Sequence, residues 1–138
     1  MRRVSISHNI ILVRECEIGD VSSMEGCPYA VLLSAREIPS DDFIKIVKIY
    51  ESLWQAGAKF IVCVGENSEK LHDSLDRACE VSEFEGGDIV TTYHEDEPVD
   101  DVVNLFIYGS GFDGAEDGFF LVVAGCGDSK LVGALEKI

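Results

Sequence analysis

The stretch that decides the fold is Lys59-Phe60-Ile61-Val62-Cys63-Val64-Gly65-Glu66-Asn67-Ser68, in which an apolar run ends in a turn and a helix start. A short continuous apolar run of this kind is typical of a strand that is covered on both faces of a sheet. Gly65 to Ser68 then offer a turn and a cap for a helix with an apolar face, carried by Leu71, Leu75, Ala78 and Cys79. This stretch therefore predicts one strand-then-helix unit.

Three further units of the same kind lie on either side of it. The first pairs an apolar run at 29–35 with an amphipathic helix that begins near Pro39 and ends at Gly57. The third pairs a β-branched run at 88–93 with a helix after Pro98. The fourth pairs the run 119–124 with a terminal helix that Asp128 or Ser129 would cap.

The predicted architecture is a single α/β domain over residues 1–138. Four successive strand-then-helix units predict a three-layer, doubly wound arrangement, with a mainly parallel sheet of four to five strands and helices on both faces. The N-terminal region 4–17 contains the apolar run Ile10-Ile11-Leu12-Val13 and adds one strand, or a bent pair, at an edge. Residues 20–26 are expected to form a loop.

The cysteines and the hydropathy pattern indicate a cytoplasmic protein. The five cysteines are odd in number and none stands in a CxxC spacing, so neither a disulfide framework nor a zinc site is expected. We expect Cys63 and Cys79 to be buried as small hydrophobic residues. No stretch approaches the roughly 18 to 20 apolar residues of a membrane-spanning helix, and the N-terminus lacks the features of a secretory signal. No cofactor or metal is expected.

Charge is distributed unevenly along the chain. The 26 Asp and Glu residues against 11 Lys and Arg give a formal net charge of −15. From Ala78 to Ser129 there are thirteen acidic residues and no Lys or Arg. Such a surface repels phosphate backbones and anionic lipids, so nucleic-acid and membrane partners are not expected, whereas a basic protein partner is favoured. The alternative explanation is that the acidic surface only keeps the protein soluble.

The acidic stretch supplies the predicted partner-binding residues, which would steer a cationic partner and pair with its charges. They are Glu80, Glu83, Glu85, Asp88, Glu95, Asp96, Glu97, Asp100 and Asp101, with further candidates at Asp113, Glu116 and Asp117. The acids that follow His94 also resemble a hard-cation site or a receiver-type phosphoacceptor pocket. Acids in the first turn of a helix favour its dipole, however, and this explains most of them without a metal.

An alternative ligand site is expected at the carboxyl ends of the strands, where open parallel sheets bind ligands. Its candidate residues are Glu66, His94, Cys126 and Asp128, and it would serve a small-molecule- or metal-dependent enzyme. A Cys/His arrangement would form there if the strands before His94 and Cys126 were neighbours. The glycine-rich turn 125–130 lacks the full spacing of a phosphate-binding loop, and a capped turn that needs small residues explains it better.

Three stretches resemble an uncharacterised family of small bacterial α/β proteins of unknown function. They are Trp54-Gln55-Ala56-Gly57-Ala58-Lys59-Phe60-Ile61-Val62-Cys63-Val64-Gly65, Leu71-His72-Asp73 and Thr91-Thr92-Tyr93-His94-Glu95-Asp96-Glu97-Pro98. The resemblance covers roughly residues 29–108 and implies no activity or catalytic residues. In size and acidity the chain is also similar to bacterial immunity proteins, which dock an acidic face on cationic toxin domains. The leading hypothesis is a non-enzymatic, immunity- or antitoxin-like protein that masks a basic toxin or another cationic partner.

Overall fold

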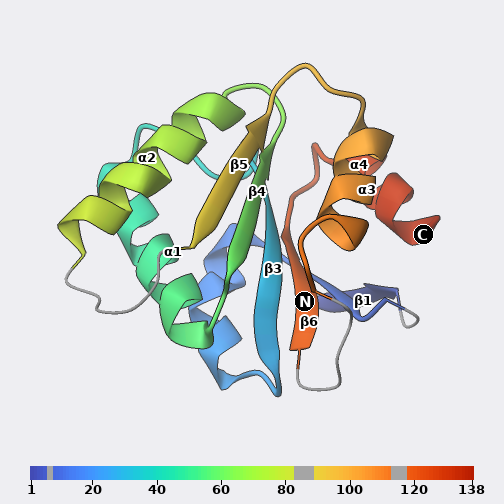
Figure 1. Ribbon diagram of the computed structural model, residues 1–138, viewed down its shortest axis with the longest axis horizontal. Coiled ribbons are helices and arrows are strands. Elements are labelled where there is room, and N and C mark those ends of the chain that lie inside the picture. The colour runs from blue at the N-terminus through green and yellow to red at the C-terminus, as the bar shows by residue number, and fades with distance from the viewer. Residues whose placement is uncertain (6–7, 83–88, 113–117) are drawn as a thin grey trace.

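A six-stranded sheet forms the centre of the computed structural model, which describes residues 1–5, 8–82, 89–112 and 118–138 (Figure 1). Its strands are β1 (Arg2–Ser5), β2 (Ile10–Val13), β3 (Cys27–Ser34), β4 (Phe60–Val64), β5 (Val90–His94) and β6 (Gly118–Val123). They lie in the order β1-β2-β6-β3-β4-β5. Neighbouring strands run parallel except β1, which is antiparallel to β2. The predicted α/β class and mainly parallel sheet are confirmed.

The helices follow the strands in the predicted order. They are the 3-10 helix η1 (Glu15–Ser23) and the α-helices α1 (Phe43–Ala56), α2 (Ser68–Val81), α3 (Val99–Tyr108) and α4 (Ser129–Glu136). Asp42 begins α1 by accepting a hydrogen bond of 3.2 Å from the Lys45 N–H. Gly57, with a φ of 97°, ends it in the left-handed conformation that the sequence predicted for a terminating glycine.

Alternate residues of the central strands enter two separate core clusters. Val31 and Leu33 of β3 pack with residues of η1, α1 and α2, whereas Ala30 and Leu32 pack with residues of α3 and α4. Figure 1 shows α1 and α2 on one side of the sheet and α3 and α4 on the other. The continuous apolar runs of the sequence therefore reflect strands with both faces buried.

The sheet has six strands, whereas four to five were expected. The difference arises at the N-terminus, where two strands form and β2 adds parallel to β6. Asn9 begins the second of them with a φ of 52°, a conformation that asparagine tolerates better than most residues. Its side-chain amide donates a 2.8 Å hydrogen bond to the Gly118 carbonyl, which anchors β2 beside β6. An apolar run of four residues does not encode this pairing.

The segment after β2 is more ordered than expected. The predicted loop at 20–26 is helical as far as Ser23, because η1 places Ile18 and Val21 in the first core cluster. Burial of these two apolar side chains stabilises a 3-10 helix of nine residues, a length that the 3-10 conformation seldom reaches.

The five cysteines form no disulfide with one another in the described part of the chain. Cys63 is buried in the core, as expected, and this burial raises the pKa of its thiol. Cys79 is half-buried and packs against the same core cluster. Among the described helices, none is long and apolar enough to cross a membrane.

Candidate functional site

Two groups of polar side chains lie at the carboxyl ends of the parallel strands, the edge where open α/β sheets bind ligands. The first follows β2, β3 and β6, and we name it the arginine network: Arg14, Ser34, Arg36, Glu37, Cys126 and Asp128. The second surrounds the end of β5, and we name it the acidic cluster: Glu69, Asp73, Asp76, Glu95, Asp96 and Glu97. The first group lies on segments that follow three strands, and the second is formed by helix α2 and the turn after β5.

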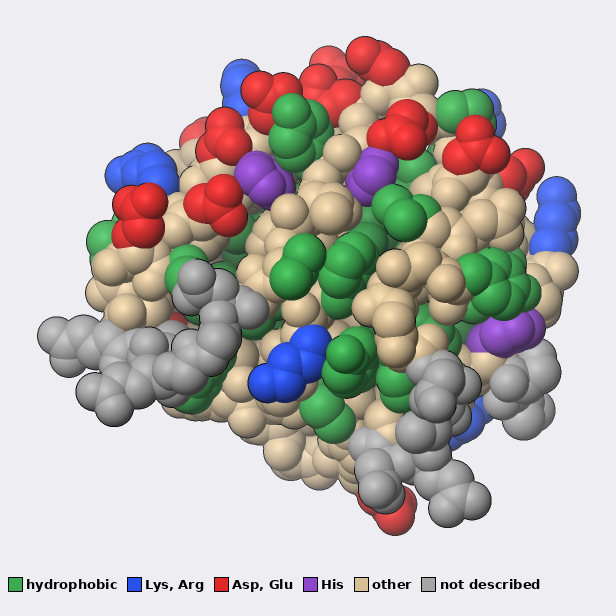
Figure 2. Space-filling model, viewed as in Figure 1, with side chains coloured by type: hydrophobic (Ala, Val, Ile, Leu, Met, Phe, Trp, Pro, Cys, Tyr) green, Lys and Arg blue, Asp and Glu red, His purple; other side chains and the backbone are tan. Residues whose placement is uncertain are grey.

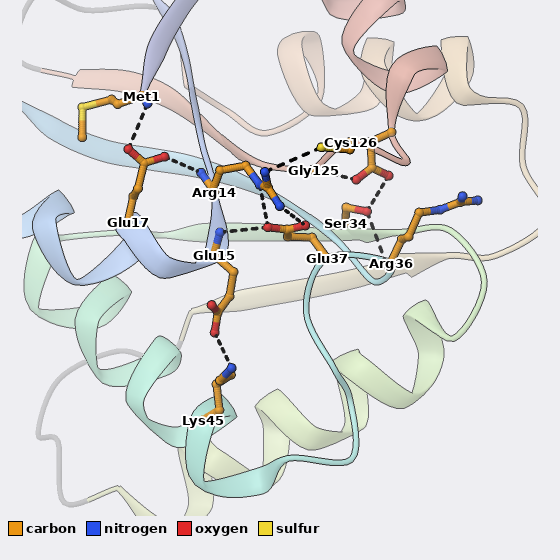
Figure 3. A network of polar contacts seen from close by, with 11 residues as sticks. Met1, Arg14, Glu15, Glu17, Ser34, Arg36, Glu37, Lys45, Gly125 and Cys126 are labelled. Atoms are coloured by element: carbon orange, nitrogen blue, oxygen red, sulfur yellow. Dashed lines mark hydrogen bonds and ion pairs between the residues drawn. The ribbon is translucent and has the colours of Figure 1, made fainter.

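Arg14 and Glu37 form the centre of the arginine network (Figure 3). The Arg14 Nε donates to Glu37 Oε1 over 2.9 Å, and Arg14 Nη2 donates to Glu37 Oε2 over 3.4 Å. Glu37 Oε1 also accepts a hydrogen bond of 3.2 Å from the Glu15 N–H. The hydrogen bond and the charge of Glu37 raise the pKa of the Arg14 guanidinium. Only 14% of the Glu37 side chain is exposed, so the protein itself satisfies this carboxylate.

Asp128 ties the turn after β6 to the end of β3. Its Oδ1 accepts a 2.7 Å hydrogen bond from the Ser34 hydroxyl, and its Oδ2 accepts a 2.9 Å bond from the Gly125 N–H. The Ser34 oxygen in turn accepts from the Arg36 N–H over 3.3 Å. Asp128 is the N-cap residue of α4, but its side chain makes no capping bond to that helix. Its carboxylate has a structural role in the turn.

The same turn packs closely against the side chains of Arg36 and Glu37, which follow β3. A Cβ atom at Gly125 would lie 2.0 Å from Glu37 Oε2, and one at Gly127 would lie 2.5 Å from Arg36 Cδ. Protein atoms therefore fill the space between the ends of β3 and β6. The two glycines allow a close approach of side chains to backbone, which fits the predicted need for small residues, whereas the predicted side-chain cap from Asp128 does not form.

Cys126 and His94 do not come together. β6 precedes Cys126 and β5 ends at His94, and β3 and β4 lie between these strands. With neighbouring strands about 4.8 Å apart, three spacings separate the strand ends by about 14 Å. Cys126 instead lies beside Arg14, whose Nη1 is 3.8 Å from its Sγ. The condition for the expected Cys/His arrangement is not met.

The alternative ligand site is divided by the strand order. Glu66 lies close to His94, because the Gly65 N–H donates to the His94 carbonyl over 3.1 Å. Cys126 and Asp128 belong to the arginine network on the far side of β3. The structure therefore brings the four predicted residues together only in pairs.

Tyr93 lies at the centre of the acidic cluster. The negative charge of Glu69 is the largest cause that raises the pKa of this phenol, followed by burial and by a hydrogen bond with Glu69. Asp73 and Glu95 raise it further. Like charges disfavour the ionised phenolate, so the raised pKa reflects a negative potential at this position.

His72 connects Tyr93 to the acidic side chains of α2. Its Nδ1 lies 3.0 Å from Asp73 Oδ1 and its Nε2 lies 3.7 Å from Asp76 Oδ2. The ring packs edge-on against Tyr93, with 5.0 Å between the ring centroids. His72 therefore contacts the ring of Tyr93 on one side and the carboxylates of Asp73 and Asp76 on the other.

The turn after β5 is held by local bonds. Glu95 Oε1 accepts a 3.1 Å hydrogen bond from the Glu69 N–H in the first turn of α2. A carboxylate at this position is favoured by the helix dipole. His94 Nδ1 bonds the carboxylate of Glu97. The cluster therefore joins α2 and the β5–α3 turn into one surface.

No Lys or Arg forms an ion pair with the acidic cluster in the part of the chain that the structure describes. Figure 2 shows acidic side chains gathered along the upper part of the face that α2, β5 and α3 form. At the α3 end the charge is more balanced, because Lys130 and Lys137 line a groove of about 610 Å³ together with Glu97 and Asp100. The negative charge is therefore most concentrated around Tyr93.

Five of the predicted partner-binding residues lie together. The turn after β5 and the first turn of α3 expose Glu95, Asp96, Glu97, Asp100 and Asp101. Glu80 is exposed near the other end of α2, about 16 Å along the helix axis from Glu69. The remaining positions lie outside the described residues: Glu83, Glu85, Asp88, Asp113, Glu116 and Asp117.

Glu69, Asp73 and Asp76 of α2 were not among the predicted partner-binding residues, because acidic and basic residues were counted along the chain. Up to Arg77 there are twelve acidic and nine basic residues, so this part looked nearly balanced. The spacing of Glu69, Asp73 and Asp76 alternates four and three residues, which places them on one helix face. Lys70 and Arg77 lie on the same helix and line a groove of about 560 Å³ together with Asp73. Comparing the charges on each face of the predicted helix would have identified this row of three acidic residues.

The chain matches one family of proteins. Residues 10–118 fit the family model described as Domain of unknown function (DUF7684). This match confirms the resemblance to an uncharacterised family and assigns no activity or site residue. No curated protein and no solved structure matches the chain. In the described ranges, no group of three or more His, Cys, Asp and Glu side chains is arranged to hold a metal ion.

Proposed function

Because the chain belongs to a family of unknown function (DUF7684), we propose its role from its own surface: a non-enzymatic, acidic protein-binding domain. It would act as an immunity or antitoxin protein that neutralises a basic toxin or another cationic partner. The observation that carries the proposal is the acidic cluster, whose carboxylates form no ion pair with Lys or Arg among the described residues. Carboxylates that no Lys or Arg of the chain neutralises keep their negative charge available to a cationic partner.

The energetics of the cluster support this proposal. Like charges three and four residues apart destabilise a helix by about 0.2 to 0.5 kcal/mol per pair. On α2, Asp73 stands at these spacings from both Glu69 and Asp76, and it also stands four residues before Arg77, whose opposite charge offsets part of the repulsion. A cationic surface would relieve the repulsion, and the negative field would accelerate its approach. Binding would thus gain both affinity and association rate from the same side chains.

The proposal extends to the type of fold and the location. We assign the fold to the three-layer, doubly wound type, since α1 and α2 pack on one core cluster and α3 and α4 on the other. A cytoplasmic location is supported by the odd number of cysteines without a CxxC pair. The enzyme alternative gains no comparable support, because Cys126 and Asp128 follow β6, whereas Glu66 and His94 lie at the ends of β4 and β5.

The direct test is to cross-link and capture the partner from the source cells and then to measure binding with both purified proteins. We expect a cationic protein. The triple variant Asp73→Asn/Glu95→Gln/Asp96→Asn should bind it at least about tenfold more weakly, which corresponds to about 1.4 kcal/mol. The matched control Asp20→Asn/Glu25→Gln/Glu136→Gln changes the net charge equally at exposed positions and should bind within about twofold of the wild type.

Two results would count against the proposal. One is a captured partner that is not cationic. The other is an equal loss of affinity in the triple variant and its control, since this would mean that only total charge matters. A thermal shift on addition of nucleotides or divalent metals would instead favour the enzyme alternative, because a ligand that binds the folded state raises its stability.

A further inference from the structure

β5 is an edge strand whose outer side has no neighbouring strand among the described residues. The Val90 N–H donates to the Lys59 carbonyl and the His94 carbonyl accepts from the Gly65 N–H, each over 3.1 Å. Val90, Thr92 and His94 therefore direct their backbone groups toward β4. Because backbone groups alternate along a strand, the N–H and C=O of Thr91 and Tyr93 point away from the sheet. Such groups are a template for another strand.

The side chains along this edge differ between its two faces. Thr91 and Tyr93 pair with Ile61 and Cys63, which belong to the core cluster under α2, so they point to the α2 side. Val90 points to the opposite side, and it is 56% exposed while Tyr93 is 42% exposed. Figure 2 shows hydrophobic side chains in the middle of this face, below the acidic ones. The edge thus offers a charged side and an apolar side.

We propose that the β5 edge takes an extended segment of the cationic partner as an added strand. Its backbone would bond to Thr91 and Tyr93, its Lys or Arg side chains would face Glu69 and Asp73, and its alternate apolar side chains would contact Val90. In this mode of recognition, main-chain hydrogen bonds give affinity and alternate side chains give specificity. The inference rests on the proposed function and specifies how the partner binds.

The spacing of charges along the edge suits a strand. Glu69 and Asp73 are four residues apart on α2, so they are separated by about 6 Å along the helix axis. Alternate residues of a strand are about 6.8 Å apart and point to the same face. Two basic side chains at alternate positions would therefore match two carboxylates of α2.

Charge also selects among the possible occupants of this edge. A second copy of the chain that pairs through β5 would bring its own acidic cluster against this one. Repulsion between like charges disfavours that contact, whereas a basic segment is attracted. The occupant is therefore a cationic strand of another protein.

The test uses the peptide acetyl-Lys-Val-Lys-Val-Lys-Val-Lys-amide with the full chain. Thr91→Pro removes the outward N–H and places a ring at the edge, but it leaves the bonds to β4 intact, because an edge strand tolerates proline where its N–H faces solvent. We expect the peptide Kd to rise at least tenfold in Thr91→Pro. In Thr91→Val, which also lacks the hydroxyl but keeps the N–H, we expect a change of less than twofold. Equal affinities for both variants would overturn the inference.

A second measurement does not depend on a substitution. A peptide with the same side chains in which every residue is N-methylated cannot donate strand hydrogen bonds in either strand direction and should bind at least tenfold more weakly. Hydrogen exchange of the Tyr93 amide should slow with the unmodified peptide and stay fast with the methylated one. Fast exchange with both peptides, or no binding of either, would contradict the added strand.

The outcomes separate this inference from the proposed function. Suppose that the Thr91→Pro chain binds the peptide normally, while Asp73→Asn/Glu95→Gln/Asp96→Asn does not. The acidic cluster would then be a docking surface, and strand addition would be wrong. If the triple variant binds the peptide and the captured partner as tightly as the wild type does, the proposed function fails as well.

Discussion

The arginine network and the acidic cluster both lie toward the carboxyl ends of the strands of one sheet, and they differ in which groups neutralise their charges. In the network, the carboxylate of Glu37 pairs with Arg14, and Asp128 accepts hydrogen bonds from Ser34 and Gly125. In the cluster, carboxylates contact the imidazoles of His72 and His94, and the charges of the cluster raise the pKa of Tyr93. The contrast shows that position at the carboxyl ends of the strands does not decide whether an acidic residue is structural. The groups that pair with its carboxylate decide whether the residue is structural.

The largest change in the free energy of unfolding is expected at the most tightly packed position of the arginine network. Gly125→Ala would place a Cβ 2.0 Å from Glu37 Oε2, so the Arg14–Glu37 pair would have to move. Overpacking of this kind lowers the free energy of unfolding by about 1 to 3 kcal/mol, measurable by urea denaturation. Gly133→Ala is the control, since nothing lies within 4 Å of a Cβ there and α4 should be unchanged or stabilised. Similar stabilities for both variants would show that the turn is loose.

A smaller difference should separate one carboxylate of each group. Asp128→Asn loses an acceptor for the Ser34 hydroxyl or the Gly125 N–H, so we expect a loss of about 1 to 2 kcal/mol of unfolding free energy. Asp96→Asn removes an exposed charge without a cationic partner and should stay within about 0.5 kcal/mol of the wild type. Thermal denaturation of the two variants measures this directly. A larger loss for Asp96→Asn would reverse the comparison.

The titration of Tyr93 should report the field of the cluster. Its folded-state pKa is raised, first by the charge of Glu69, so Glu69→Gln should lower it toward the ordinary tyrosine value. NMR of the ring as a function of pH follows this change, and Glu136→Gln serves as a distant control. Because the folded pKa exceeds the unfolded one, the contribution to stability is complete below the unfolded pKa and is lost as pH rises through the folded pKa. No response to Glu69→Gln would mean that the potential has another source.

Most of the fold could be predicted from the sequence, because its signals are local. The apolar run before Gly65 and the periodic face of α2 each fix one element within about ten residues. The pairing of β2 with β6 could not be predicted, since it joins segments more than 100 residues apart, held in part by the Asn9 amide on Gly118. Strand order is decided by such long-range contacts.

The candidate sites were predicted less completely, for the same physical reason. Arg14 and Glu37 lie 23 positions apart in the sequence and meet only because β2 and β3 flank β6. Cys126 and His94 were expected together, but β3 and β4 separate them. The acids of the β5–α3 turn were found because they are contiguous in the chain. Those of α2 required reading charge along a helix face.

The central claim is that the acidic cluster attracts a cationic partner, and the salt dependence of the association rate tests it most directly. The measurement is stopped-flow binding of the captured partner between low and physiological ionic strength, where the Debye length falls from about 30 to about 8 Å. We predict that the association rate constant of the wild type and of the Asp20→Asn/Glu25→Gln/Glu136→Gln control falls about tenfold or more. The Asp73→Asn/Glu95→Gln/Asp96→Asn variant should start slower and respond much less to salt. A wild-type rate that does not change with salt would contradict the claim.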